Sequence, residues 1–331
     1  MRHHFGDFLD RDGSYWTIAP NRERFAYCLD DVPEGSFDAT IATIGKDDKN
    51  WSRVLTFPNL VELTLHEPTS GQLAAIASLP SIRRLRVTHA RPQCIDFISS
   101  MGALEEVVLE YVSGFNDLSP LRALGSLRAL HVENLRRVSD FSGLAGATAL
   151  KYLAIYGTLD WQQPIDDFEF LRGLPQLEVF ALWQIKCRAA YPALLPAVTL
   201  SRLKKLRVHR SYLATEEYAL LEEALGGVDG ANWGPYANVA RSQIELPSTD
   251  IRAQLSDEVI RAEHPEVTLC YDGRRQIGDP ASRWFEFTGR AAGSAKCSSP
   301  TAEARCREKS QRYDRMRRQA KVLIARERSG E

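Results

Sequence analysis

The strongest constraint on the fold is an internal repeat. Seven segments share one pattern, in which an apolar residue is followed three and five positions later by two more. Their first apolar residues are 22, 22, 23, 23, 27 and 26 residues apart. The segments are Leu60/Leu63/Leu65, Ile82/Leu85/Val87, Leu104/Val107/Leu109, Leu127/Leu130/Val132, Leu150/Leu153/Ile155, Leu177/Phe180/Leu182 and Leu203/Leu206/Val208. Chance alternation would not keep this register seven times, so the chain is a repeat array.

Each repeat carries the parts of a strand followed by a returning segment. A similar turn precedes every segment, as in FPNL, LPSI, LGSL and LPQL. A second apolar pair follows five of the strands: Leu73/Ile76, Ile95/Ile98, Leu118/Leu121, Phe141/Leu144 and Phe168/Leu171. One unit cannot bury its own leucines, so stacked units share a core and each adds one strand to a parallel sheet.

These units resemble the leucine-rich-repeat family, in its short-repeat bacterial, internalin-like type. The pieces NDLSPL, SDFSGL and DDFEFL are similar to that type's return segment. The resemblance implies an α/β solenoid, a horseshoe with a curved parallel sheet. One departure matters, because the family places Asn or Cys three residues after the last strand leucine. This chain has Pro68, Ala90, Val112, Leu135, Thr158, Ile185 and Ser211 there. The turn must therefore satisfy its backbone groups in another way.

The repeat divides the chain into three parts. We expect an N-terminal cap over residues 1–54, about seven repeats over 55–225 and a C-terminal cap or extension over 226–331. The apolar residues available to the first cap are Trp16, Phe25, Tyr27, Phe37, Ile41 and Ile44. Trp233 and Tyr236 are expected to begin the second cap, after a glycine-rich turn.

The extension is predicted to end in a basic helix over about 300–328, since Pro300 and Glu303 are typical of a helix start. One apolar stripe runs along it: Cys306, Tyr313, Met316, Ala320 and Leu323. A helix docked by this stripe is the favoured interpretation. Contact with a partner or a nucleic acid is the alternative, but aromatic residues do not interleave with the basic ones, so nucleic acid is disfavoured.

The concave face of the sheet is the expected binding surface. Alternate strand residues point to opposite faces, so the residues between the buried leucines point outward. Tyr152, Tyr156 and Trp183 fall there, and Trp161 lies in one of two long insertions, 157–165 and 186–196. Charged residues flank them: Arg84, Arg86, Glu106, Glu110, Glu133, Lys205 and Arg207. An aromatic centre with a charged rim is typical of a protein interface. The alternative is that the aromatics pack as a local core under the insertions.

The sequence lacks the common motifs of catalysis, of cofactor binding and of metal binding. It has no P-loop, GxGxxG, GxSxG or HExxH motif, so we expect no catalytic residue and no cofactor. The outward residues His66 and His131 stand three strands apart, about 14 Å, which is too far to share an ion. We expect no metal site.

Charge and composition favour a cytoplasmic protein without membrane contact. The formal net charge is −1, and no run of about 18 apolar residues is present. Residues 1–10 hold no secretory signal, and the six cysteines are scattered and expected to be reduced.

Together these features favour a non-catalytic scaffold or inhibitor that holds another protein on the concave face. The resemblance adds the immunity proteins that neutralise bacterial toxins as one such role. An effector or enzyme whose repeats recruit a substrate to an activity in the extension is the alternative, and nucleic-acid binding through the basic helix is the third hypothesis. The sequence does not determine the partner or the oligomeric state.

Overall fold

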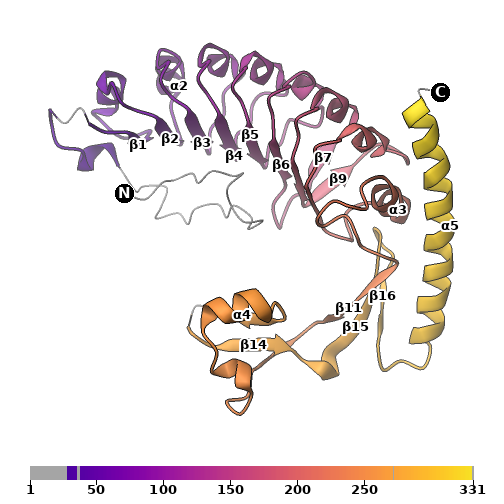
Figure 1. Cartoon of the computed structure of the whole chain (residues 1–331). Coiled ribbons are helices and arrows are strands. Elements are labelled where there is room, and N and C mark those ends of the chain that lie inside the picture. The colour runs from indigo at the N-terminus through magenta and orange to yellow at the C-terminus, as the bar shows by residue number, and fades with distance from the viewer. Residues whose placement is uncertain (1–27, 36–37, 271, 330–331) are drawn as a thin grey trace.

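The repeats form one long parallel sheet. The computed structural model describes residues 28–35, 38–270 and 272–329. Eight strands follow one another in the order β1-β2-β3-β4-β5-β6-β8-β10 and curve into a solenoid (Figure 1). Their bounds are β1 (Ile41–Gly45), β2 (Glu62–His66), β3 (Arg84–Thr88), β4 (Glu106–Glu110), β5 (Ala129–Glu133), β6 (Tyr152–Tyr156), β8 (Val179–Trp183) and β10 (Lys205–Val208). The predicted curved parallel sheet is confirmed.

The register follows the repeat. Each central leucine-type residue pairs with its counterpart in the next strand, and all of these side chains are buried. They are Leu63, Leu85, Val107, Leu130, Leu153, Phe180 and Leu206. Strand β1 precedes the seven repeats and pairs in parallel with β2, with Ala42 opposite Leu63. Residues 1–27 and 36–37 of the expected N-terminal cap, which include Trp16, Phe25, Tyr27 and Phe37, lie outside the described residues.

Short helices return the chain along the convex side. Helix α2 (Ser70–Ile76) does so after β2, and single 3-10 turns serve the other repeats. These turns are Trp51–Thr56, Asp96–Ser100, Ser119–Ala123, Ser142–Leu144, Glu169–Gly173 and Leu195–Thr199. Their second apolar pairs, such as Leu118 and Leu121, join the strand leucines in one continuous core. A short unit therefore buries its apolar residues only against its neighbours.

In one repeat, a glutamine side chain makes hydrogen bonds to the turn backbone at the place where the expected asparagine is absent. Strands β7 (Gln163–Ile165) and β9 (Ile185–Cys187) lie in the two insertions and pair in parallel. The buried Gln163 side chain accepts a hydrogen bond from Leu135 N at 3.0 Å and donates one to Val138 O at 2.7 Å. Leu135 occupies the position where the family usually has asparagine. The insertion thus satisfies the backbone of the preceding turn.

Two helices cover the C-terminal end of the array. Helix α3 (Thr215–Ala224) follows β10, and α5 (Ala302–Ser329) lies alongside α3 (Figure 1). The apolar stripe of α5 enters the main core through Tyr313, Met316, Ala320 and Ile324. The predicted basic terminal helix is therefore present and docked. The expected stripe member Leu323 is wrong, because Ile324, four residues after Ala320, continues the buried face.

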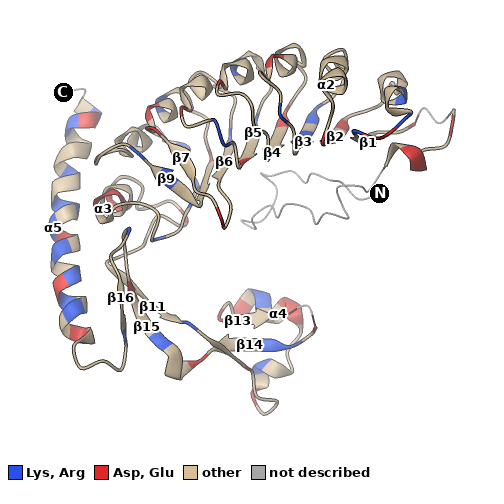
Figure 2. Cartoon of the chain, turned by 180° about the vertical axis from the view of Figure 1, so that it is seen from behind, with Lys and Arg blue, Asp and Glu red and all other residues tan. Residues whose placement is uncertain are grey.

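The extension between α3 and α5 forms an arm. Strands β11 (Tyr236–Ala240), β15 (Arg283–Phe287) and β16 (Ser294–Lys296) make an antiparallel sheet at its base. A distal lobe, residues 243–278, holds β12 (Gln243–Glu245), β13 (Val267–Leu269), β14 (Arg275–Gly278) and α4 (Asp257–Glu263). Figures 1 and 2 place this arm on the concave side of the solenoid. None of the helices in the described part of the chain has the length and apolar character needed to cross a membrane.

Candidate functional site

The charged residues expected on the concave face pair with one another across neighbouring strands. Arg84 donates to Glu62 with an Nη1–Oε1 distance of 2.6 Å and lies 3.6 Å from Glu106. Arg128 reaches the same Glu106 at 3.0 Å. The glutamates of this row are fully or almost fully buried. The expectation that Arg84 and Glu106 present charge at an exposed rim is therefore wrong. Their side chains are placed to hold one strand to the next.

The most buried ion pair joins Arg86 and Glu110. Both side chains are fully buried. The guanidinium donates through Nε at 3.0 Å and through Nη2 at 2.9 and 3.1 Å to the two carboxylate oxygens. Such a bidentate pair fixes geometry and neutralises both charges. The expected exposure of these two residues is also wrong, and Glu133, at 7% exposure, is buried as well.

Two of the four predicted aromatic anchors are buried. Tyr152 and Tyr156 are 5% and 9% exposed and form a small apolar cluster on the outward side of the sheet, with Val108, Ala129, Ala154 and Ala181. The Tyr156 ring also meets His131 edge-on at 4.9 Å. These two tyrosines therefore pack in a local core, which was the alternative interpretation of the sequence. Their predicted exposure is wrong, because both rings are packed in this cluster.

Trp183 is the anchor that stays open. Its side chain is 43% exposed at the carboxyl end of β8. Tyr212 supports it edge-on with ring centroids 5.9 Å apart, and His209 packs on Tyr212 at 5.4 Å. We call Trp183, His209 and Tyr212 the Trp183 cluster. An exposed indole held by neighbouring rings offers a large apolar contact that is already ordered.

The remaining predicted residues lie in the first insertion and in β10. Trp161 is half-buried in the first insertion, where its backbone oxygen accepts a hydrogen bond from Thr158 N at 2.7 Å. Lys205 is paired with Asp229 at 3.0 Å, and Arg207 is half-buried. Gly157 separates the two tryptophans and donates to Trp183 O at 2.8 Å. A Cβ at Gly157 would lie 2.2 Å from Gln184 O, so only glycine fits between these loops.

A row of left-handed residues follows the strands and was not foreseen. Glu67, His89, Tyr111, Asn134 and Gln184 have φ between +46° and +56°. Each of the first four is the residue directly after its strand, and its N–H donates at 2.9 Å to the last carbonyl of the next strand. The sheet ladder thus extends one residue past each strand while the chain turns away. Asn134 and His89 are residue types enriched in this conformation, whereas Glu67, Tyr111 and Gln184 are not, so the residue types alone do not predict the row.

The row forms a polar pocket of about 350 Å³ at the carboxyl edge of β2 to β5. We call it the strand-end pocket, and its lining residues are Glu67, His89, Arg91, Tyr111, Ser113, Asn134 and Arg136. The His89 and Tyr111 rings stack almost parallel, 4.8 Å apart and inclined by 3°, and His66 meets His89 edge-on at 5.4 Å. These rings give the pocket a flat wall.

The loops behind the pocket are packed closely against each other. Gly114 has φ of +113°, and a Cβ there would lie 2.4 Å from Pro92 O. Ser113 N donates to Ala90 O at 2.9 Å. These contacts join the loop after β3 to the loop after β4. Arg91 and Ser113, which come from these two loops, are therefore held at a fixed separation at the base of their side chains.

The extension carries surface ion pairs. Asp250 accepts hydrogen bonds from the backbone and guanidinium of Arg252, and these bonds lower the pKa of Asp250 to about 2. The Arg274 backbone and guanidinium lower the pKa of Asp272 in the same way. A carboxylate stabilised by an adjacent arginine stays ionised, so these groups are neither proton donors nor bases near neutral pH.

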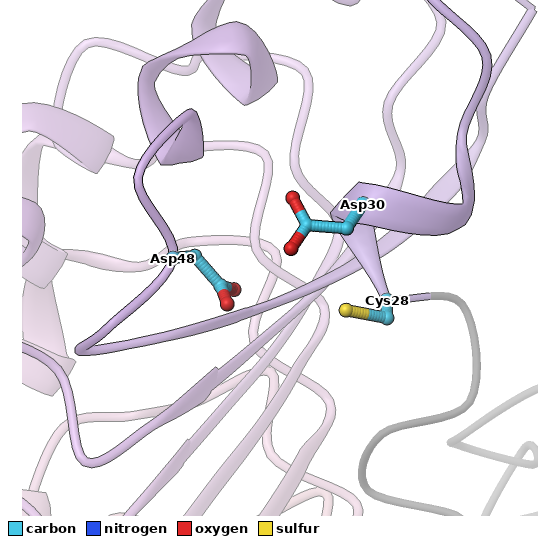
Figure 3. Close-up of side chains that lie close together, drawn as sticks. All are labelled: Cys28, Asp30 and Asp48. Atoms are coloured by element: carbon cyan, nitrogen blue, oxygen red, sulfur yellow. The ribbon is translucent and has the colours of Figure 1, made fainter.

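One group of side chains has the spacing of metal ligands. The Cys28 sulfur and carboxylate oxygens of Asp30 and Asp48 all lie within 4.8 Å of one another, near the start of the sheet (Figure 3). A thiolate and two carboxylates have the donor chemistry to coordinate a divalent ion. Asp48 already accepts a hydrogen bond from Gly45 N at 2.7 Å, and Asp30 is exposed to solvent. A structural role in the turn after β1 accounts for Asp48.

Comparison with known proteins finds likeness in structure alone. No protein-family model matches the chain, and no curated protein sequence matches it. Two internalins from Listeria monocytogenes are similar in structure. The first has 21% identity and a TM-score of 0.41, covering 50% of this chain and 46% of its own. The second has 22% identity and a TM-score of 0.37, covering 51% and 67%.

A leucine-rich-repeat protein of Leptospira interrogans is also similar, with 12% identity and a TM-score of 0.38, over 58% of this chain and 54% of that one. The chain thus spans about half the length of the first of these structures. These likenesses are to the fold of the repeats. The chain's own repeat, its parallel sheet and the shared register establish that fold, which is a leucine-rich-repeat solenoid.

Proposed function

We propose that the chain is a non-catalytic binding scaffold that holds another protein on the curved sheet, with Trp183 as the main anchor. The observation that carries the proposal is the exposure of this indole on a rigid support. A partner that covers it gains apolar burial without ordering a flexible side chain. The neighbouring concave residues are buried or paired, so they stabilise the sheet and the open carboxyl edge makes the contact.

The test begins with the full-length tagged chain as bait, followed by mass spectrometry of captured proteins and titration of the purified partner by calorimetry. Trp183→Ala is expected to weaken binding by about 2 kcal/mol or more, roughly 30-fold, because central aromatic anchors dominate interfaces. Ile251→Ala is the matched control, since Ile251 is an exposed apolar residue (73%) in the distal lobe. It is expected to leave affinity unchanged.

Stability separates an anchor from a core residue. Leu130 is fully buried, and Leu130→Ala is expected to lower the free energy of unfolding by about 2–5 kcal/mol. Trp183→Ala is expected to cost about 1 kcal/mol or less, because almost half of its side chain is in solvent. A loss as large as that of Leu130→Ala would place Trp183 in a local core and refute its role as an anchor.

A narrower form of the proposal is that the partner is a bacterial toxin and the chain its cytoplasmic inhibitor. The near-neutral charge and the six free cysteines fit an intracellular binding protein. Co-expression tests this directly. The chain is expected to rescue bacteria that express a toxin encoded beside it, and the Trp183→Ala variant is expected to rescue them less well. Full rescue by the variant would contradict the role of Trp183.

A further inference from the structure

The strand-end pocket contains two arginines that differ from those on the concave face. Arg91 and Arg136 are both exposed, whereas Arg84, Arg86 and Arg128 are turned toward neighbouring glutamates. Arg91 makes no ion pair within the described part of the chain. Among the described residues, the one side-chain hydrogen bond of Arg136 goes to the Asn134 amide oxygen, at a long 3.4 Å. Their charges are therefore not neutralised by a neighbouring carboxylate of the described structure.

The other polar groups of the pocket add donors. Ser113 and Tyr111 carry hydroxyl groups, and Asn134 carries an amide. Glu67 is the single acidic side chain lining the pocket. A hydrogen bond and ion pair from Lys46 hold the pKa of Glu67 below its ordinary value, so this carboxylate is ionised and already engaged. Counting Lys46 with the lining, three positive charges face one negative charge. A site rich in donors and positive charge takes an anionic acceptor.

The spacing of the two arginines restricts the shape of that ligand. Arg91 follows β3 and Arg136 follows β5, which stand two strand steps apart, or about 10 Å. Where the two side chains extend side by side, their guanidinium groups keep about this separation, and each pairs with its own acidic group. A peptide in the polyproline II conformation has three residues per turn and rises about 3.1 Å per residue, so two acidic side chains three residues apart lie on the same side and match this distance. Between them the peptide can lie along the flat wall of His89 and Tyr111.

We propose that the strand-end pocket binds an acidic segment of a protein partner, with two Asp or Glu residues three positions apart paired to Arg91 and Arg136. The proposal rests on the proposed scaffold function and names the chemistry of the partner. The Trp183 cluster lies farther along the same edge of the sheet, so an anchor on Trp183 and an acidic segment in the pocket belong to one interface. The contacts at Gly114 join the two loops that carry Arg91 and Ser113.

The test uses a fluorescent peptide as probe and fluorescence anisotropy at low salt. The probe is four repeats of Glu-Gly-Ser, which places a glutamate every third residue, and its control is the same peptide with glutamine. The full-length protein is expected to bind the glutamate peptide at least 10-fold more tightly than the glutamine peptide. The double variant R91A/R136A is expected to lose this preference.

A matched double variant removes the same charge elsewhere. Arg137 and Arg202 are exposed and do not line the pocket, so R137A/R202A is expected to change the affinity less than twofold. An equal loss in both double variants would mean that any arginine serves, and would overturn the proposal. Absence of binding to the glutamate peptide would overturn it too. Binding of inorganic phosphate without binding of the glutamate peptide would assign the pocket to phosphorylated ligands and would also contradict this proposal.

The partner itself separates this proposal from the proposed function. If a captured partner binds R91A/R136A as tightly as the unmodified protein, the scaffold stands and the pocket assignment fails. If no partner is captured while the peptide preference is present and lost in R91A/R136A, the pocket assignment stands and the scaffold proposal fails. Circular dichroism spectra of both double variants establish that each is folded before either result is interpreted.

Discussion

The charged side chains of Arg86 and Glu110 are both fully buried, and each neutralises the charge of the other. Removing one member leaves the other charged in a site without water. Arg86→Met is therefore expected to lower the free energy of unfolding by about 3–5 kcal/mol. The double change R86M/E110L removes both charges and is expected to recover most of that loss. Urea denaturation of the two variants measures both values.

The exposed pair of Arg83 and Glu105 provides the control for this prediction. Arg83 has about half of its side chain in solvent. Arg83→Met is expected to change stability by less than about 1 kcal/mol, because an exposed ion pair contributes little. A similar cost for Arg83→Met and Arg86→Met would contradict the central role of burial. So would a double variant no more stable than R86M.

At this scale the sequence predicts the buried face well and the outward face poorly. Spacing alone identifies Leu63, Leu130 and Phe180 as core, because the strand period is fixed by geometry. It does not tell whether an outward residue meets solvent or a neighbour. Arg84 and Arg86 both occupy outward positions of β3. Only the structure shows that Arg86 is close enough to Glu110 to form the bidentate pair. Likewise, Tyr156 and Trp183 occupy equivalent outward positions, but Tyr156 is buried and Trp183 is exposed.

Among the elements, α5 depends on one apolar face. Ile324 is 5% exposed in the main core, and Val322, two residues earlier, is 53% exposed. Ile324→Asp places a charge against the core without a partner and is expected to cost about 3 kcal/mol or more. Val322→Asp is expected to cost less than about 0.5 kcal/mol. Thermal unfolding and trypsin cleavage within α5 measure the difference. Equal behaviour of the two variants would show that the helix is not docked by this face.

Charge complementarity adds to this packing. Arg312 pairs with Glu216 at 3.4 Å, Lys321 with Glu223 at 3.5 Å, and Tyr313 donates to Glu222 at 2.9 Å. The acidic residues of α3 thus meet basic residues of α5 (Figure 2). The sequence predicts a basic helix, but the pairing needs knowledge that α3 lies beside it. Three of the positive groups that suggested nucleic acid, those of Arg312, Arg317 and Lys321, contact α3.

The first turn of α3 contains a buried carboxyl group. Glu217 is 3% exposed and accepts hydrogen bonds from Ala193 N at 2.7 Å and Leu194 N at 3.1 Å. Burial raises the pKa of Glu217 above its ordinary value of 4.5, although the two N–H donors oppose that rise. Between the unfolded and folded pKa values, the folded chain binds more protons. The contribution of Glu217 to stability is therefore full below pH 4.5 and is lost as the pH rises through the folded pKa.

The corresponding experiment compares the unmodified chain with Glu217→Gln in urea at pH values from 4 to 8. The difference between their free energies of unfolding is expected to favour the unmodified chain most at pH 4 and to shrink as the pH rises. Other titrating groups cancel in this difference. A difference that does not depend on pH would show that the pKa of Glu217 is the same in the folded and unfolded chains.

For the whole molecule, burial is distributed unequally. The solenoid shares one continuous core, whereas the distal lobe buries three apolar side chains among the described residues: Leu246, Ile260 and Val267. So little burial stabilises a unit of this size only weakly. Backbone amides of β13 and β14 are expected to exchange with solvent roughly 100-fold faster than those of β4 to β6. Hydrogen exchange with mass spectrometry measures this ratio. Equal protection would mean that the lobe opens only with the whole chain.

The row of left-handed residues after the strands fixes the distances between binding features along the carboxyl edge of the sheet. Each strand advances the edge by about 4.8 Å, and the His89 position after β3 is four steps from Trp183 at the end of β8, or about 19 Å. Because the ladder joins every step, this interval cannot be adjusted by a side-chain rotation. Under the proposed function, a protein that fits one point of the edge but carries its second feature at the wrong interval is expected to bind more weakly. Adding one repeat of about 22 residues between β5 and β6 would lengthen the interval by one step while keeping the lining residues of the strand-end pocket together.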